Sequence, residues 1–396
     1  MTISDRTSVW CLAFGQTLIW AGTYYLFPAM IVRWENDFGW SRAELTSGFT
    51  IAILASAVFS PVAGRLIDKD LGPYLLFGGP FIGGLLVGTL YLVDTLFLFY
   101  GVWLCLGVCM AFSLYEPCFA YVIRMKGTDA KPHITLITLV AGFASTISFP
   151  VAHHLSDLFG WRDALFAFVL LVSFIGAPLM WIGARNLGHH HSALEAIEQA
   201  KQIVGRARYG FLLWPKFWLI TLALSLIFMT HATLINHLLL LLEDRQIDAG
   251  TAVLAASFMG PMQVFGRVVA TLVGRFFSNS VITAVCFVFS ISAVGALMLA
   301  AKLPIFLAVF IALQGSGIGV SSIMKPVLAR EILGGENFGL KSGAMSVPFF
   351  IGNAFSALIG SLLWAIGGYD LVLEVLLAIL VTGFMALIAA IRLARP

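Results

Sequence analysis

Charged residues are scarce in this chain. Asp, Glu, Lys and Arg account for 11% of its 396 residues, whereas about a quarter of an ordinary soluble domain is charged. A soluble globular protein of this composition is therefore excluded. The formal net charge is only +3, from 23 basic and 20 acidic residues, so bulk charge does not indicate a nucleic-acid partner.

Cysteine is rare as well. The five cysteines lie in apolar stretches, and none has the CxxC spacing of a redox or zinc motif: Cys11, Cys105, Cys109, Cys118 and Cys286. We expect small packing residues, with neither a disulfide framework nor a zinc site. The sequence also lacks a P-loop and a nucleophile–base cluster. ATP-driven transport and a membrane-embedded enzyme are therefore disfavoured, and no cofactor or metal is expected.

Long apolar runs fill the chain instead, and 60% of its residues are hydrophobic. A bilayer core takes about 20 apolar residues in helical form, and backbone polar groups in lipid must be bonded within their own segment. We predict an all-α integral membrane protein with twelve transmembrane helices, at about 9–31, 45–66, 74–93, 97–123, 134–156, 163–184, 215–241, 250–274, 280–301, 304–328, 342–364 and 371–391.

Lys and Arg residues set the direction of these helices, because they accumulate in cytoplasmic loops. With the N-terminus in the cytoplasm, most of the 23 fall on the cytoplasmic side, and those on the outer side are Arg33, Arg42, Arg162, Arg245 and Lys302. We predict a multi-pass protein of the cell inner (plasma) membrane with both termini in the cytoplasm.

The two halves of the chain share a weak internal register. At an offset of about 209 residues, Glu116-Pro117 in the fourth span matches Lys325-Pro326 in the tenth, and Gly64-Arg65 matches Gly274-Arg275. Two six-helix bundles that rock about a central site are a common transporter architecture. We predict an N-terminal bundle at 1–184, a cytoplasmic linker at 185–214 and a C-terminal bundle at 215–396.

The loop after the second predicted span resembles the signature loop of the major facilitator superfamily. It reads Gly64-Arg65-Leu66-Ile67-Asp68-Lys69-Asp70-Leu71-Gly72-Pro73, whereas the family form is Gly-x-x-x-Asp-Arg-x-Gly-Arg-Arg. The chain keeps the Gly, the Asp and a cation, and lacks the Arg pair. The family's loop latches the cytoplasmic face, so the resemblance implies that Asp68 and Arg65 act in gating. The alternative is a basic cytoplasmic turn with one acid.

A closer resemblance is to bacterial members of the monocarboxylate-transporter-like group. It is carried by Phe27-Pro28, by 37–42 (Asp-Phe-Gly-Trp-Ser-Arg), by Tyr115-Glu116-Pro117, by Gly160-Trp161-Arg162 and by 260–267 (Gly-Pro-Met-Gln-Val-Phe-Gly-Arg). In that group an Arg in the eighth span, four residues after an Asp, helps to bind the substrate carboxylate. Arg267 matches this Arg and Gln263 replaces the Asp, while the group's Lys after Phe-Pro is Ala29 here.

Three charges lie well inside predicted spans. Arg267 should face water or a partner, and a guanidinium can hold a carboxylate through two hydrogen bonds. Gln263 is one turn earlier on the same helix face. The alternative for Arg267 is a structural counter-charge near the interface.

Glu116 and Lys325 are predicted to pair across the central cleft in one state and to separate in the other, unless they form a permanent pair. Glu116 is also a candidate for proton coupling.

Aromatic and histidine side chains complete the candidate substrate site. Trp20 and Tyr24 are four residues apart and form one stripe of the first span, which aromatic core packing would explain equally well. Tyr115, next to Glu116 in the chain, and His237 in the seventh span are further candidates. A buried, hydrogen-bonded imidazole is the alternative for His237.

We expect a secondary active transporter that moves a small solute by alternating access. The resemblance implies an organic anion such as a monocarboxylate as the solute, protons as the coupling ion, and a monomer in the bilayer. The alternative is a proton-driven efflux pump for amphipathic compounds, which needs an acid in the cavity without a dominant Arg. Glu116 is compatible with such a pump, and Arg267 argues against it.

Overall fold

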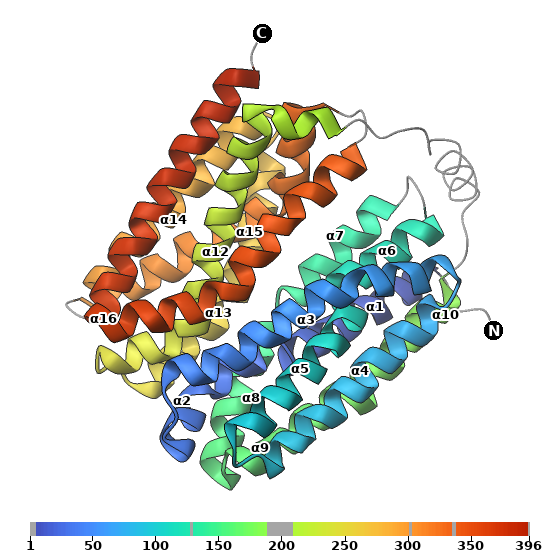
Figure 1. Ribbon diagram of the computed structural model, residues 1–396, viewed down its shortest axis with the longest axis vertical. Helices are drawn as coiled ribbons and strands as arrows, with labels where there is room; N and C mark the ends of the chain where they lie inside the picture. Colours follow the sequence, from blue (N-terminus) through green and yellow to red (C-terminus); the bar gives the residue numbers. More distant parts are fainter. Residues whose placement is uncertain (1–4, 127–129, 188–208, 301–302, 335–337, 395–396) are drawn as a thin grey trace. The chain divides into compact units, whose positions relative to one another are not determined.

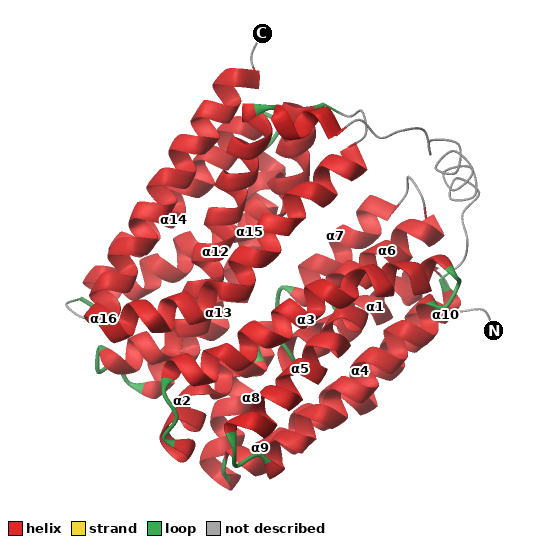
Figure 2. Cartoon of the chain, viewed as in Figure 1, coloured by secondary structure: helices red, strands yellow, loops and turns green. Residues whose placement is uncertain are grey.

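The computed structural model describes residues 5–126, 130–187, 209–300, 303–334 and 338–394. Within these ranges the chain consists of helices and loops, without strands (Figure 2), so the all-α fold class is confirmed. The chain divides into two compact units, Met1–Gly205 and Arg206–Pro396. This division falls inside the predicted linker 185–214, most of which lies outside the described residues. Each unit is described by itself.

The first unit consists of short and long helices in the order of its predicted spans. They are α1 (Asp5–Gly22), α2 (Leu26–Phe38), α3 (Arg42–Asp68), α4 (Gly72–Thr89), the 3₁₀ turn Leu90–Leu92, α5 (Leu96–Ser113), α6 (Tyr115–Lys126), α7 (Ala130–Ala141), α8 (Ala144–Phe159), α9 (Trp161–Val169), the π-helical turn Leu170–Gly176 and α10 (Ala177–Asn186). Within the unit, α5 packs against α3 and α4, and α1 packs against α7 and α10 (Figure 1).

The second unit has longer helices. After the 3₁₀ turn Tyr209–Leu213 come α12 (Pro215–Asp244), α13 (Ala249–Val273), α14 (Asn279–Leu299), α15 (Ile305–Leu333) and α16 (Phe338–Ala394). The backbone of α16 leaves the helical region at Gly367 and Gly368, and Gly368 has a φ of 66°. This value suits glycine, which has no Cβ. The pair therefore divides α16 into two arms, and α12 packs along α16 (Figure 1).

The twelve predicted spans do not match twelve separate helices one to one. Ten helices of the described residues are long and apolar enough to cross a membrane. One of them, Ala344–Ala394, contains the bend at Gly367-Gly368 and supplies two spans. The predicted first span, 9–31, is divided between α1 and α2. Counting these two cases accounts for all twelve predicted spans.

Glycine allows close contact between α3 and α5. A Cβ built on Gly107 of α5 would lie 2.1 Å from the carbonyl oxygen of Ala52 in α3. In contrast, a Cβ on Gly101 of the same helix would meet no atom within 4 Å. Small residues at helix contacts let two backbones approach closely in a membrane, where packing supplies much of the stability. Gly107 is therefore part of the core of the first unit.

These two glycines give a matched test of the packing. We expect Gly107→Ala to lower the melting temperature of the purified protein, because overpacking typically costs about 1–3 kcal/mol. Gly101→Ala should leave the melting temperature unchanged or raise it slightly, because alanine favours helix. Thermal unfolding in detergent, followed by intrinsic fluorescence, measures both variants. Equal melting temperatures for the two variants would contradict the observed α3–α5 contact.

Candidate functional site

The first span is interrupted in the middle of an apolar run. Proline has no N–H, so Pro28 cannot donate to the carbonyl of Tyr24 four residues earlier. Accordingly α1 ends at Gly22, residues 23–25 form a turn, and α2 begins at Leu26. The N–H of Tyr25 donates to the carbonyl of Trp20, five residues back, at 3.0 Å. The interruption places two tyrosines where the helix is unwound.

The fourth span is interrupted for the same reason. Pro117 cannot donate to the carbonyl of Ser113, and α5 ends at Ser113. Leu114 has an extended backbone, with a ψ of −160°, before α6 begins at Tyr115. The side chain of Gln16 in α1 donates from Nε2 to the Ser113 carbonyl oxygen at 2.7 Å. An amide from the first span thus bonds a carbonyl that the helix leaves without its usual donor.

Three predicted substrate-binding residues meet at these two interruptions. The ring centroid of Trp20 lies 4.7 Å from that of Tyr115 and 5.1 Å from that of Tyr24. All three rings are half-buried, and the next residue, Glu116, is exposed in the first turn of α6. The first unit therefore brings together an aromatic cluster (Trp20, Tyr24 and Tyr115) at the start of the short helix that carries Glu116.

The other end of α6 is fixed by ion pairs. Arg124 binds Asp70 at 2.7 Å, and Lys126, which is 2% exposed, binds Asp5 of α1 at 2.6 Å. Asp70 belongs to the signature-like loop, where it has a positive φ of 61°. The α6 helix is therefore connected at its C-terminal end to both α1 and the loop after α3.

The two predicted gating residues lie on the last turn of α3. Arg65 is exposed there. The backbone of Asp68 ends the helix, and its side chain lies outside the described residues. Their role in gating stays a prediction. The acid of this loop that forms a described ion pair is Asp70, two residues beyond the position that the family resemblance singled out.

In the second unit, Arg267 is buried at the crossing of α13 and α15. It is 6% exposed. Its Nε donates to the carbonyl of Gly319 at 3.1 Å, and its Nη2 donates to the Ser322 hydroxyl at 3.3 Å. The guanidinium therefore connects two helices of one bundle. Its predicted role in binding a carboxylate and the alternative of a counter-charge near the interface both stay predictions.

The neighbouring Gln263 contributes its backbone to the same crossing. A Cβ on Gly319 would lie 2.3 Å from the carbonyl oxygen of Gln263, and one on Gly266 would lie 2.5 Å from that of Ser316. The backbones of α13 and α15 are thus in close contact along the turn of α13 that precedes Arg267. The side chain of Gln263 is half-buried, and its predicted contact with a solute stays a prediction.

Lys325 lies among aromatic rings of the same unit. Its Nζ lies 3.2 Å from the ring centroid of Phe349 in α16 and 5.6 Å from that of Phe228 in α12. The side chain is half-buried. Cation–π attraction stabilises an ammonium ion in such a setting, the more so where water is excluded. Lys325 is therefore a charge inside the helical bundle that remains partly accessible.

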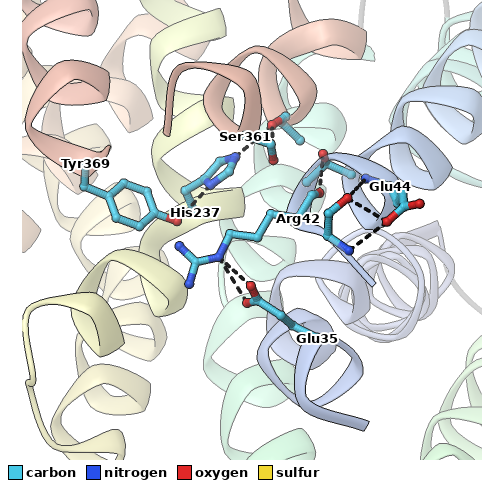
Figure 3. A network of polar contacts seen from close by, with 9 residues as sticks. Glu35, Arg42, Glu44, His237, Ser361 and Tyr369 are labelled. Carbon is cyan, nitrogen blue, oxygen red and sulfur yellow. Dashed lines mark hydrogen bonds and ion pairs between the residues drawn. The ribbon is translucent and has the colours of Figure 1, made fainter. Parts of the chain in front are cut away.

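His237 lies at the bend of α16. Its Nε2 lies 2.8 Å from the carbonyl oxygen of Ala357, which can only accept, so Nε2 carries the proton. Its Nδ1 then accepts from the hydroxyl of Tyr369 at 3.1 Å (Figure 3). Ala357 and Tyr369 lie on opposite sides of Gly367-Gly368, so this 1% exposed imidazole connects α12 to both arms of α16. Its predicted role in substrate binding stays a prediction.

Arginines predicted on the outer side form ion pairs within their own units. The described pairs are Arg33 with Asp157 at 2.6 Å, Arg42 with Glu35 at 2.8 Å, Arg162 with Asp37 at 2.9 Å, and Arg245 with Asp370. The Arg42–Glu35 pair is drawn in Figure 3. Lys302 lies outside the described residues. Each pair joins two helices or helix ends, which gives these outer cations a structural role.

Two residues that hold the ends of α6 were assigned no role on the basis of sequence. Gln16 is a lone amide in the first apolar run, and Asp70 is the second acid of the signature-like loop. The signal for Gln16 was available in principle, because Pro117 removes a backbone donor in the fourth span and some group must replace it. No local pattern identifies which helix supplies that group.

Two helical units, with interrupted spans and charges inside the bundles, define a polytopic membrane transporter. The sequence model of the Major Facilitator Superfamily matches residues 12–300, and the chain belongs to this family. A comparison with curated protein sequences gives no match.

Solved structures of transporters share the fold. One is a bacterial homolog of the human lysosomal transporter Spinster, in an inward-facing and occupied conformation, with a TM-score of 0.68 at 12% identity, covering 98% of this chain and 96% of that one. Another is a point mutant of the nucleoside transporter NupG, with a TM-score of 0.71 at 14% identity, covering 98% of this chain and all of that one. At these identities the likeness establishes the fold alone.

The two readings of Arg267 predict different behaviour. We expect Arg267→Gln to lower the melting temperature without any added solute, because it removes a buried charged donor worth about 1.5–3 kcal/mol. Arg275→Gln is the matched control, since Arg275 is exposed just beyond the same helix, and it should shift the stability by less than about 0.5 kcal/mol. If Arg267→Gln unfolds like the wild type and loses only stabilisation by a solute, the crossing role is wrong and the substrate-binding role is supported.

Proposed function

We propose that this transporter carries a small organic anion, such as a monocarboxylate, across the inner membrane together with protons. It would work as a monomer with both termini in the cytoplasm, and its two bundles would alternate between outward and inward access. The observation that carries the proposal is the half-buried ammonium group of Lys325 over the ring of Phe349. The monocarboxylate-like resemblance supports the choice of a carboxylate.

Lys325 suits an anion better than Arg267 does. Both cations lie within helices of the second unit, but the guanidinium of Arg267 contacts the α15 backbone and is almost fully buried. The ammonium of Lys325 is more accessible and contacts ring faces. A charge held inside a membrane bundle is costly and marks a solute or ion pathway by default. We therefore assign the solute carboxylate to Lys325.

Glu116 is the proposed proton-coupling group. It is exposed within the first unit, at the start of α6, and it follows Tyr115 of the aromatic cluster. A carboxyl group inside a span can take up a proton on one side of the membrane and release it on the other, as in other proton-driven carriers. Coupled to an anion at Lys325, this step would make the net transport symport.

One observation favours a second candidate function. An exposed carboxylate that follows Tyr115 of the aromatic cluster in the chain also suits an amphipathic cation, because aromatic faces attract cations and the acid neutralises them. This describes a proton-driven efflux pump. The nucleoside transporter of similar fold is named for a solute of neither class, so nucleosides belong in any panel of test solutes.

A panel of solutes separates these candidates. We expect small carboxylates to raise the melting temperature of the purified protein, because a ligand at a hundred times its dissociation constant adds about 2.7 kcal/mol. Lys325→Gln should lose this stabilisation. Lys216→Gln, which removes a lysine that lies over the Trp214 ring, should keep it. Stabilisation by lipophilic cations or nucleosides, with none by carboxylates, would refute the anion proposal.

Glu116 and Lys325 belong to different units, and their pairing in one state of the cycle is a further part of the proposal. Either Glu116→Lys or Lys325→Glu alone should abolish transport, because like charges would then meet. The double exchange should recover part of the thermal stability that each single exchange loses, since opposite charges can pair again, although transport should stay lost because an acid at position 325 repels the solute carboxylate. Thermal unfolding and flux into proteoliposomes measure all three variants. A double variant that is no more stable than the single ones would show that the two residues do not pair.

A further inference from the structure

The carbonyl of Ser113 has lost its helical partner. In an α-helix each N–H donates to the carbonyl four residues earlier, and the residue four positions after Ser113 is Pro117, which has no N–H. The chain leaves the helical region at Leu114, between α5 and α6. An unbonded carbonyl is costly inside a membrane, so this position requires a donor from elsewhere in the unit.

Gln16 supplies that donor from α1. Its side chain is 0% exposed, and its Nε2 lies 2.7 Å from the carbonyl oxygen of Ser113 and 3.4 Å from that of Leu114. The same nitrogen lies 3.9 Å from Sδ of Met180 in α10. The amide is thus enclosed by packing and directed at the two carbonyls where the fourth span is interrupted.

The second unit lacks this arrangement within its described residues. Lys325-Pro326 corresponds to Glu116-Pro117, yet α15 continues through Pro326 from Ile305 to Leu333. At the same offset of about 209 residues the counterpart of Gln16 is Ser225, whose buried hydroxyl forms no hydrogen bond in the part of the chain that the structure describes. The first unit, which carries Glu116, therefore has an interrupted span with a carbonyl bonded by a side-chain amide. The described residues of the second unit have no such arrangement at the corresponding position.

We propose that Gln16 is a positioning residue for Glu116. Its amide fixes the start of α6, and Trp20, one turn later in α1, contacts Tyr115 in the first turn of α6. The ion pairs of Arg124 and Lys126 hold the other end of this helix. Gln16 thereby sets the orientation in which Glu116 presents its carboxyl group. The proton-coupling role of Glu116 rests on the proposed function, whereas its placement by Gln16 does not.

Hydrogen–deuterium exchange of the protein in lipid nanodiscs tests the first step without any solute. In Gln16→Leu, peptides covering residues 113–118 should exchange about five- to tenfold faster, the factor that one hydrogen bond of ordinary net strength contributes. Thr17→Val is the matched control, because the Thr17 hydroxyl bonds within α1, to the Ala13 carbonyl at 2.9 Å. Unchanged exchange in Gln16→Leu, or an equal increase throughout the first unit, would overturn the proposal.

A double variant separates positioning from simple bonding of the carbonyl. Pro117→Ala restores a backbone N–H that can donate to the Ser113 carbonyl. The double variant Gln16→Leu/Pro117→Ala should therefore recover slow exchange, because α5 and α6 can join into one helix. The reactivity of Glu116 with a hydrophobic carbodiimide, read by mass spectrometry, reports its placement. Because Glu116 is already exposed, we expect the loss of its fixed orientation to change this rate in Gln16→Leu and to leave it altered in the double variant. A wild-type rate in either variant would overturn the positioning role, whatever solute the protein carries.

Discussion

The first unit depends on one constraint, which is that every backbone carbonyl inside a bilayer needs a donor. Pro117 removes the donor of Ser113, and the side-chain amide of Gln16 replaces it at 2.7 Å. Without this bond the fourth span would contain a buried carbonyl that lacks its helical donor. With it, the span can be interrupted, and a short helix with its own orientation follows. That helix, α6, presents Tyr115 beside Trp20 of the first span and carries Glu116 as its next residue.

The charges inside the two bundles fall into two groups. One group maintains the architecture: Arg267 connects α13 to α15, and arginines at helix ends join neighbouring helices through ion pairs such as Arg33 with Asp157. The other group, Glu116 and Lys325, is more accessible, and the ammonium group of Lys325 lies over aromatic rings. An acid in one half and a base in the other, at matching positions of the duplicated sequence, suit a carrier whose solute and proton are handled by different bundles.

Much of the fold could be predicted from hydrophobicity, because each span is a long apolar run and its backbone must form a helix. The interruptions at 23–25 and at Leu114 were not predicted, since hydrophobicity taken over a span of about 20 residues does not register a break of a few residues. The meeting of Trp20 with Tyr24 follows from helical spacing, whereas its contact with Tyr115 is non-local. The family resemblance identified Arg267 but not the direction of its side chain. That direction depends on how closely α13 approaches α15 at Gly319. His237 was likewise ambiguous, because its partners lie more than a hundred residues away.

The most direct test of the whole account is uphill transport in proteoliposomes. An imposed inward pH gradient should drive a hydrophilic carboxylate to accumulate above its external concentration in liposomes with the wild-type protein, and a gradient of opposite sign should empty them. Glu116→Gln should abolish this accumulation while still allowing exchange of labelled for unlabelled solute. Accumulation that ignores the pH gradient, or that persists unchanged in Glu116→Gln, would contradict proton-coupled anion transport.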